Sequence, residues 1–277
     1  MIWIVTTEEE ARTICHGQGV KDLGSVFVSV GVVFSRTPAD LPCFRHDDIV
    51  LTRTKQKWLV DALVYFTQNV GRRIGETADV YDYDLNKEKL KAAMRHYHVK
   101  TPQSFTADTL PGEPFDVFVK PLSWGDSLGI DSDSHCHTKA EVMRKLAAIK
   151  QYGPSMIEEY VDGYDCTVGV IKNEEGYYTA GLVIESPKGF LDYDTKENDS
   201  ETYRPLNSQA VEDLALEVFN IIGATSYGRI DFRVNSQGEP YVLEVNLCPG
   251  LSRTGYMSMA FSQKGYRYED MIRMIFK

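Results

Sequence analysis

Two carboxylates and one amide near the carboxyl-terminal end have the residue types that bind a divalent cation. Asp231, Glu244 and Asn246 belong to two strand-like runs on either side of the turn-forming segment 235–238. A hairpin folded at this turn places Asp231 opposite Glu244, where two carboxylates repel each other unless a cation compensates them. Such oxygen ligands suit Mg²⁺, with Mn²⁺ as the alternative ion. A solvated polar face is the competing interpretation, and Arg229 beside the carboxylates argues against it.

The same hairpin has an apolar face, which predicts its register and its burial. A fold centred on the middle of the turn pairs Asn235 with Pro240 and Arg229 with Asn246. Because side chains alternate between the two faces of a strand, the apolar residues lie opposite the charged ones. We expect this apolar face to be buried, and its members are Ile230, Phe232, Val234, Tyr241, Leu243 and Val245.

Composition and charge limit the kinds of protein that this chain can be. It has 277 residues, of which 43% are hydrophobic and 25% are charged, with a net charge of −10. This balance is typical of a globular protein with room for one to three domains. It speaks against nucleic-acid binding, which favours a basic surface. No membrane span or signal peptide is evident, and five irregularly spaced cysteines predict reduced thiols in a cytoplasmic setting.

Strand-like and helix-like runs alternate over the first ninety residues. This alternation predicts a small α/β unit with a parallel sheet. A polar and aromatic segment, 79–86, is predicted to link this unit to the rest of the chain. Arg53, at a predicted strand end, is interpreted as a surface arginine in preference to a contact with a substrate carboxylate. The expected strands are 1–7, 25–34 and 47–54, and the expected helices are 57–70 and 8–15, the latter ending at Gly17 and Gly19.

A predicted strand followed by a glycine-rich loop is the clearest feature of the middle section. Phe118 and Lys120 share one face of the strand 116–121. The loop 123–129 can present backbone N–H groups to a phosphate. It is not a Walker A loop, because no Gly-Lys-Ser/Thr follows, and an ordinary hairpin loop is the alternative. The other expected elements here are helices 86–97 and 138–151 and strands 155–161 and 164–172.

The expected helix 86–97 separates apolar from basic residues. Its inward face would carry Leu90, Ala93 and Met94. We expect its solvated side to carry Lys87, Lys89 and Lys91.

The short sequence His135-Cys136-His137 has residue types that bind metals. Adjacent residues of one loop rarely converge on a single ion, and no partner cluster is evident in the sequence. We therefore expect these residues to have no metal role.

Four acidic residues crowd the predicted strand end and turn at 158–165. A charge cluster of this kind usually faces solvent. The alternative is that Glu158 and Asp165 accept hydrogen bonds from an adenine amine and from ribose hydroxyls.

The last third combines regular elements with one long polar segment. Residues 186–205 show no periodicity, so we expect a loop that is either disordered or a functional lid, with Lys196 as its basic candidate. The regular elements are a strand at 177–185, a helix at 208–222 capped by Gly223, and a closing helix at 268–276.

Five of these features occur in one order along the chain, and together they resemble the ATP-grasp ligases, most nearly the D-alanine–D-alanine ligases. The likeness runs from Asn86 to the carboxyl terminus. The amino-terminal unit resembles the family's preceding domain loosely, and its segment 48–53 is similar to the lysine-biosynthesis and ribosomal-protein glutamate-ligase branch. The five features are Lys120-Pro121 with the glycine-rich loop, 158–165, 229–231, 244–246 and Pro249-Gly250.

This resemblance implies an α/β and α+β protein with the ATP-grasp fold, in which two α+β subdomains hold ATP between them. A small amino-terminal α/β domain would occupy 1–85, a central subdomain 86–172 and a catalytic subdomain 173–277.

The resemblance also assigns roles to single residues. It implies Mg²⁺ ligands at Asp231, Glu244 and Asn246. It also implies a charge-stabilising catalytic arginine, Arg229, and a lid lysine, Lys196, that meets the γ-phosphate. The implied nucleotide-binding residues are Lys91, Lys120 and Ser127 at the phosphates and Glu158, Glu159, Val161 and Asp165 at the adenosine, where the family more often has glutamate in place of Asp165.

The implied activity is an ATP-dependent ligase that joins a carboxylate to an amine through an acyl phosphate, with an amino acid or a peptide as substrate. D-alanine–D-alanine ligase is one alternative, and a non-catalytic ATP-binding sensor or scaffold is another. Intact metal ligands, with Arg229 and Lys196, favour an enzyme. Small molecules are the expected partners, and a homodimer is left open.

Positions near the expected substrate site depart from the pattern of D-alanine–D-alanine ligases. Acidic residues, Asp126 and Glu197, stand where those ligases carry a serine and an aromatic residue. Counted from Gly250, the position of their substrate-binding serine is Gly255, and Arg253 could receive a carboxylate instead. Because acidic side chains favour an amine-bearing substrate, we expect an acceptor other than D-alanine, either another amino acid or a peptide.

Overall fold

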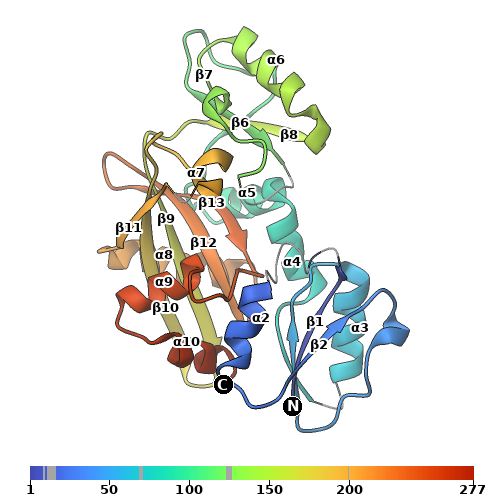
Figure 1. The fold of residues 1–277 in the computed structure, drawn as a ribbon. Coiled ribbons are helices and arrows are strands. Elements are labelled where there is room, and N and C mark those ends of the chain that lie inside the picture. Colours follow the sequence, from blue (N-terminus) through green and yellow to red (C-terminus); the bar gives the residue numbers. More distant parts are fainter. Residues whose placement is uncertain (9, 11–16, 69–70, 123–126, 199) are drawn as a thin grey trace.

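The described residues form three β-sheets, each with its own helices (Figure 1). The computed structural model describes residues 1–8, 10, 17–68, 71–122, 127–198 and 200–277. The amino-terminal sheet (blue) lies beside a five-stranded sheet from the carboxyl-terminal half, and the second four-stranded sheet stands at the top of the view. The predicted combination of α/β and α+β units is confirmed.

The amino-terminal sheet is parallel, as the alternation of strand and helix patterns predicts. Its strand order is β2-β1-β3-β4, and every neighbouring pair runs in the same direction. Fully buried Val5, Val50, Leu59 and Leu63 join this sheet to the helix α3. The elements are β1 (Ile2–Thr6), α2 (Gly17–Gly24), β2 (Val30–Phe34), β3 (Asp48–Thr52), α3 (Lys57–Thr67), β4 (Gly71–Ile74) and α4 (Ala78–Leu85).

Two expectations for this unit were wrong. Gly17 and Gly19 were expected to end a helix, but both lie inside the helix α2, whose Leu23 is buried in the core. The segment 79–86 forms most of α4, which buries the ring of Tyr81, and its role as a link stays a prediction. Arg53 is only 2% exposed and donates a hydrogen bond to the hydroxyl of Tyr227 at 2.9 Å, so it is not a surface arginine. The expected helix 8–15 lies largely outside the described residues.

The upper sheet has the strand order β5-β8-β6-β7 and carries α6 on one face. Val117 and Val119 of β6 point toward this helix, so Phe118 and Lys120 share the opposite face, as predicted. A capping box between Thr138 and Glu141 begins α6. The elements of this region are α5 (Lys87–His96), β5 (Ser104–Phe105), β6 (Val117–Pro121), β7 (His135–Cys136), α6 (Lys139–Ala148) and β8 (Ser155–Glu159).

The large sheet is antiparallel and is covered on both faces. Its order is β11-β10-β9-β12-β13. Val218 and Phe219 of α8 pack on one face, while Phe261 of α9 and Met271 of α10 belong to the cluster on the other. The helix α8 ends at Ile221, and Gly223 follows its C-cap residue with a φ of +72°. The elements are β9 (Gly163–Asn173), β10 (Gly176–Glu185), α7 (Tyr193–Glu197), β11 (Thr202–Pro205), α8 (Gln209–Ile221), β12 (Tyr227–Asn235), β13 (Pro240–Asn246), α9 (Tyr256–Gln263) and α10 (Tyr268–Ile275).

The change from one sheet to the next falls at the start of β9. This strand begins at Gly163 and pairs with both β10 and β12. It therefore belongs to the large sheet, although most of it lies inside the segment 86–172. The division into domains 1–85, 86–172 and 173–277 stays a prediction.

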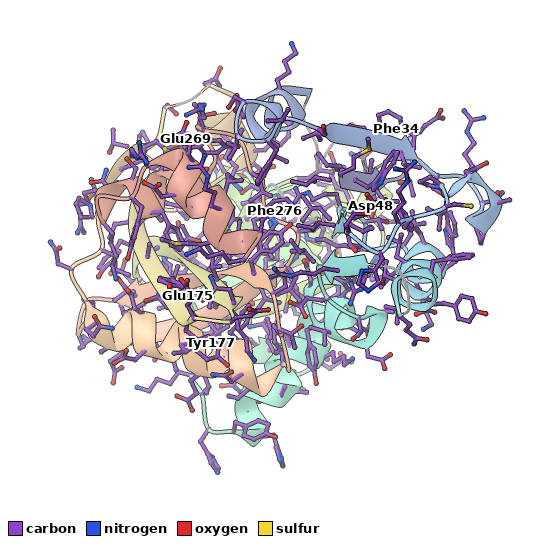
Figure 2. The ribbon with its side chains drawn as sticks, turned by 90° about the horizontal axis from the view of Figure 1, so that it is seen from below. Phe34, Asp48, Glu175, Tyr177, Glu269 and Phe276 are labelled. Atoms are coloured by element: carbon purple, nitrogen blue, oxygen red, sulfur yellow. The ribbon has the colours of Figure 1, made fainter. Side chains whose placement is uncertain are left out.

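The amino-terminal unit is packed against the end of the chain. The rings of Phe27 and Phe276 lie 4.7 Å apart, and the guanidinium of Arg72 donates to the backbone oxygen of Phe276 at 3.1 Å. In Figure 2, Phe276 lies between the side of Phe34 and Asp48 and the side of Glu175 and Tyr177. Among the helices that the structure describes, none has the length and apolar character needed to cross a membrane.

Candidate active site

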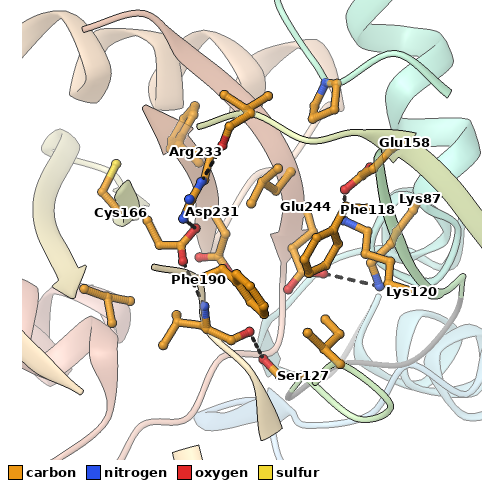
Figure 3. Close-up of a pocket in the computed structure, with 18 of the residues that line it drawn as sticks. Lys87, Phe118, Lys120, Ser127, Glu158, Cys166, Phe190, Asp231, Arg233 and Glu244 are labelled. Carbon is orange, nitrogen blue, oxygen red and sulfur yellow. Dashed lines mark hydrogen bonds and ion pairs between the residues drawn. The ribbon is translucent and has the colours of Figure 1, made fainter. Parts of the chain in front are cut away.

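A cavity lies where the upper sheet faces the large sheet (Figure 3). Phe118 and Lys120 enter it from β6, while Arg229 and Asp231 enter it from β12 and Glu244 from β13. The cavity thus joins most of the residues that the sequence pattern singled out. The remaining sequence-predicted residues in its lining are Ser127, Glu158, Glu159, Val161, Asp165 and Lys196.

The hairpin β12–β13 has the predicted register on one side of a bulge and not on the other. Asp231 lies opposite Glu244 and Arg229 lies opposite Asn246, as predicted. A register shift between Asp231 and Phe232 then pairs Pro240 with Val234, so the predicted pairing of Pro240 with Asn235 is wrong. A β-bulge adds one residue to one strand and reverses which side chains face the core. For this reason Val242 is buried and Leu243 lines the cavity, contrary to prediction.

Cationic side chains compensate the two carboxylates of the hairpin. Nε and an Nη nitrogen of Arg229 donate to the two oxygens of Asp231, each at 2.9 Å, and Thr167 donates to the same carboxylate at 2.6 Å. The ammonium of Lys87 lies 3.3 Å from Glu244. The repulsion that the sequence pattern implies is therefore balanced by two basic residues. The third predicted ligand, Asn246, accepts a backbone hydrogen bond from Cys248 at 3.1 Å and is not in the cavity lining.

The charge state of Glu244 follows from its neighbours. Its side chain is 32% exposed toward the cavity. Burial raises the pKa of Glu244, but the positive charges around it lower that pKa further, to about 2. Glu244 is therefore a carboxylate at any physiological pH. The cations responsible are Lys87, Lys120, Lys196 and Arg229.

Glu158 forms the other charged centre of the cavity. Its carboxylate binds the ammonium of Lys120 at 2.5 Å and that of Lys91 at 2.9 Å, with Glu158 itself only 3% exposed. Burial raises the pKa of Glu158, but these two lysines lower it below its ordinary range. The structure therefore pairs the predicted adenine ligand with both predicted phosphate lysines.

The helix α5 presents its lysines differently from the sequence expectation. Lys87 and Lys91 are buried instead of solvated, and only Lys89 lies at the surface, where it pairs with Asp82. Lys91 has no exposed side-chain surface and also donates to the backbone oxygen of Pro102. Lys87, one turn earlier, lines the cavity. Sequence reasoning gave it no role, although the i, i+4 spacing of two lysines on one helix face was a usable signal.

A second arginine, Arg233, organises the wall near Asp165. Its guanidinium lies 3.1 Å from the carboxylate of Asp165, and its Nε donates to the backbone oxygen of Val161 at 2.8 Å. The same guanidinium donates to the backbone oxygen of Gly189 at 2.7 Å. Burial raises the pKa of Asp165, which Arg233 opposes. Arg233 is a residue of β12 to which the sequence analysis assigned no function.

The segment 186–205 is not the irregular loop that the sequence suggested. It contains the short helix α7 and the strand β11, which pairs with β10. Asp192 begins α7 by accepting the backbone N–H of Thr195 at 2.8 Å, and this aspartate is fully buried. Ser127 donates to the backbone oxygen of Leu191 at 3.2 Å, so the glycine-rich loop contacts this segment (Figure 3). Lys196 of α7 faces the cavity.

The predicted substrate residues that the structure describes lie apart from the cavity lining. Arg253 pairs with Glu269 at 2.7 Å, and Gly255 is the residue before α9. Neither these residues nor Gly250 line the cavity. Tyr256, which the sequence reasoning missed, does line it, and the guanidinium of Arg229 lies 5.2 Å from the centre of its ring. Asp126 and the side chain of Glu197 lie outside the described residues.

Two α+β units with a charged cavity between them, preceded by a parallel α/β unit, define the ATP-grasp fold. Residues 80–277 match the family model described as D-ala D-ala ligase C-terminus. The chain therefore belongs to this family, and the resemblance inferred from the sequence motifs is confirmed.

Individual relatives and solved structures agree with this assignment. The chain is 30% identical over 206 residues to the D-alanine–D-alanine ligase of Maridesulfovibrio salexigens and 29% identical over 212 residues to that of Aquifex aeolicus. These matches cover 68% and 69% of the chain and 65% and 68% of the relatives, so the chain spans about two thirds of their length.

The similar solved structures cover almost all of the chain. One is D-alanine–D-alanine ligase from Bacillus anthracis complexed with ATP, with a TM-score of 0.72 and 16% identity. The match covers 99% of this chain and 95% of that one. Another is the VanG D-Ala:D-Ser ligase from Enterococcus faecalis, with a TM-score of 0.75, 15% identity and coverage of 99% and 98%. At these identities the likeness shows the fold, which is the predicted one.

Proposed function

We propose that this chain is an ATP-dependent carboxylate–amine ligase that forms an amide bond through an acyl phosphate. One observation carries the proposal: a single cavity combines an acidic pair, Asp231 and Glu244, with basic side chains, four of which lower the pKa of Glu244. Such a set can bind a polyphosphate together with a divalent cation, because each charge has a counterpart in the nucleotide complex. The four basic residues are Lys87, Lys120, Lys196 and Arg229.

The acidic pair fits Mg²⁺. Both carboxylates face the cavity from adjacent strands in direct register, and hard oxygen ligands are the ones that this ion prefers. Bound there, Mg²⁺ would neutralise phosphate charge and orient the γ-phosphate. On this proposal Lys87 and Lys120 hold the phosphates, while Lys196 reaches the γ-phosphate from α7. Lys91 acts through Glu158, which it binds directly.

Apolar and polar groups farther along the cavity suit a nucleoside. Phe118, Tyr160 and Phe190 supply flat apolar surfaces on which a base can stack. Asp165, held in place by Arg233, is the proposed ribose acceptor. The backbone of residues 159–161 would meet the edge of the base.

The chemistry then needs no covalent enzyme nucleophile. A substrate carboxylate oxygen attacks the γ-phosphorus, the bond to ADP breaks, and the acyl phosphate forms. An amine attacks the acyl carbon, and the phosphate leaves with the former carboxylate oxygen as the amine loses a proton. Burial lowers the pKa of Arg229, but Asp231 and Glu244 raise it overall, so this guanidinium stays positive beside the developing oxyanion.

We propose an acceptor other than D-alanine, either another amino acid or a peptide, in a cytoplasmic reaction. Acidic groups expected beside the substrate, Asp126 and Glu197, support this choice. D-alanine–D-alanine ligase is the second candidate, because the relatives and solved structures bear that name. A non-catalytic ATP sensor is a third, which the full set of charged groups in the cavity disfavours.

Phosphate release separates these functions. The purified chain is incubated with ATP, Mg²⁺ and either D-alanine alone or a panel of L-amino acids and dipeptides. Release that depends on one member of the panel supports the proposed ligase. Efficient turnover with D-alanine alone would establish the second candidate, and nucleotide binding without release under every condition would establish the sensor.

A further inference from the structure

Two histidines and an aspartate converge at the edge strand β7 of the upper sheet, on the face that also carries Phe118. Nε2 of His135 lies 2.9 Å from Oδ1 of Asp116, and Nδ1 of His137 lies 3.1 Å from the same oxygen. The two imidazole rings are 4.4 Å apart. One ligand atom from each of the three side chains lies within 4.8 Å of the other two, which is close enough for all three to bind one ion.

The backbone register creates this convergence. Strands β6 and β7 are antiparallel, with Phe118 opposite His135, and the backbone N–H of Phe115 binds the oxygen of His137 at 3.1 Å. Because side chains alternate along a strand, the two histidines share the face opposite Cys136. The thiol of Cys136 is buried and donates to the backbone oxygen of Asp133, on the other face.

We infer that Asp116, His135 and His137 form a site for a divalent transition-metal ion such as Zn²⁺. Two imidazoles and one carboxylate are typical zinc ligands, whereas Mg²⁺ favours oxygen ligands alone. Bonds of about 2.0–2.1 Å in a tetrahedral site separate neighbouring ligand atoms by about 3.3 Å. The separations of 2.9 and 3.1 Å are within a few tenths of an ångström of that value. Water would complete the shell.

The third ligand is remote in the sequence, because Asp116 lies 19 residues before His135. The two histidines occupy alternate positions, so the short motif His135-Cys136-His137 does not reveal this ligand. The side chain of Asp116 is 64% exposed and that of His137 is 51% exposed, so an ion can enter from solvent.

The site also contacts the wall of the candidate active site. The ring of His135 stacks on that of Tyr160, with centres 3.7 Å apart and planes 18° apart. Tyr160 lines the cavity and stacks in turn on Phe118. An ion that fixes His135 therefore restrains the surface proposed to hold the base. This coupling rests on the proposed function, whereas the metal site itself does not.

Zinc binding to the full chain tests the site directly. The protein is stripped with a chelator and titrated with zinc chloride against a chromogenic competitor, without nucleotide or Mg²⁺. We expect one ion per chain. His137→Asn should weaken binding at least tenfold, as should Asp116→Asn, whose exposed position makes misfolding an unsuitable explanation. The matched control is His46→Asn, at an exposed histidine outside the cluster, which should bind like the wild type.

Equal zinc affinity in the wild type and in both cluster variants would overturn the site, as would the lack of stoichiometric binding. Cobalt supplies a second measurement, because a tetrahedral site with imidazole ligands gives Co²⁺ a visible absorption that His137→Asn should abolish. Saturating zinc should then change the dissociation constant for ATP at least twofold in the wild type and not in His137→Asn. An unchanged constant despite zinc binding would keep the site and overturn the coupling.

Discussion

Glu158 and Glu244 are both carboxylates beside lysines in one cavity, yet their surroundings differ. Glu158 is 3% exposed and has ammonium groups at 2.5 and 2.9 Å. Glu244 is 32% exposed, and the ammonium of Lys87 lies 3.3 Å away. The first carboxylate is almost completely buried in the cavity wall, whereas the second is open to the cavity.

Because of this difference, we interpret the ion pairs of Glu158 as structural and Glu244 as a candidate metal ligand. Removing an ion pair from water costs several kcal/mol per ion, which only close geometry and further hydrogen bonds can offset. The hydrogen bonds of Lys91 to Thr101 and Pro102 offset part of this cost at Glu158, whereas Oε2 of Glu158 has no hydrogen-bond partner among the described residues besides its ion pair with Lys91. Glu244 keeps solvent contact, so an incoming metal ion can replace Lys87, whose ammonium lies 3.3 Å away. Changes at the two carboxylates should therefore affect different properties.

The largest expected effect is the loss of stability in Glu158→Gln. The substitution leaves two buried ammonium groups without their carboxylate, which typically costs about 3–5 kcal/mol. We expect the free energy of unfolding in urea to fall by that amount. The matched control is Glu239→Gln, since Glu239 pairs with Lys100 in an exposed bridge that solvent screens, so its loss should have little effect on stability. Similar losses in both variants would contradict the distinction between buried and open carboxylates.

Glu244→Gln should instead affect activity. It removes one negative charge from the proposed Mg²⁺ site while the buried face of the hairpin is unchanged, so we expect turnover at limiting Mg²⁺ to fall at least tenfold. The unfolding free energy should fall less than in Glu158→Gln, because Glu244 is 32% exposed whereas Glu158 is 3% exposed. Glu239→Gln, on the same hairpin, again serves as the control and should retain normal turnover. Normal turnover in Glu244→Gln would remove this residue from the metal site.

The comparison of Glu158 with Glu244 also shows which parts of the site could be predicted from the sequence. Asp231 and Glu244 were predictable because strand alternation and a recognisable turn determine which residues face each other. The face of the hairpin on which Leu243 lies was not predictable, because a β-bulge depends on tertiary packing that no local sequence pattern indicates. The fold was predictable from motifs in a fixed order, and the parallel amino-terminal sheet from alternation alone.

Charge partners were the least predictable feature. Lys91 and Glu158 are 67 residues apart in the sequence, and nothing local indicates that they pair. A lysine on a polar helix face has the same sequence signature whether it meets solvent or a buried carboxylate. Arg233 is a similar case, because its partners Asp165 and Gly189 come from other strands and loops.

The segment carrying Lys196 should respond to nucleotide at the open side of the cavity. Lys196 lines the cavity, where its positive charge is among those that lower the pKa of Glu244. We expect trypsin cleavage within 186–205 to slow at least threefold when a non-hydrolysable ATP analogue and Mg²⁺ are added. AMP is the control, because it lacks the γ-phosphate. Equal protection by AMP and the analogue would show that Lys196 does not depend on the γ-phosphate.

The smallest expected effect concerns pH, and it tests whether the neighbouring cations keep Glu244 ionised. The pKa of this group is lowered from an ordinary 4.5 to about 2. A group whose pKa is lowered in the folded state stabilises that state fully above its unfolded-state pKa. This stabilisation is lost only as pH falls through the folded-state pKa. Between pH 8 and pH 5.5 Glu244 should therefore stay ionised, and the ratio of wild-type to Glu244→Gln kcat/KM should change less than about twofold. Both enzymes share every other titrating group, so this ratio isolates Glu244. A ratio that falls steadily toward one by pH 5.5 would mean that Glu244 protonates there, and that the surrounding lysines do not hold its charge.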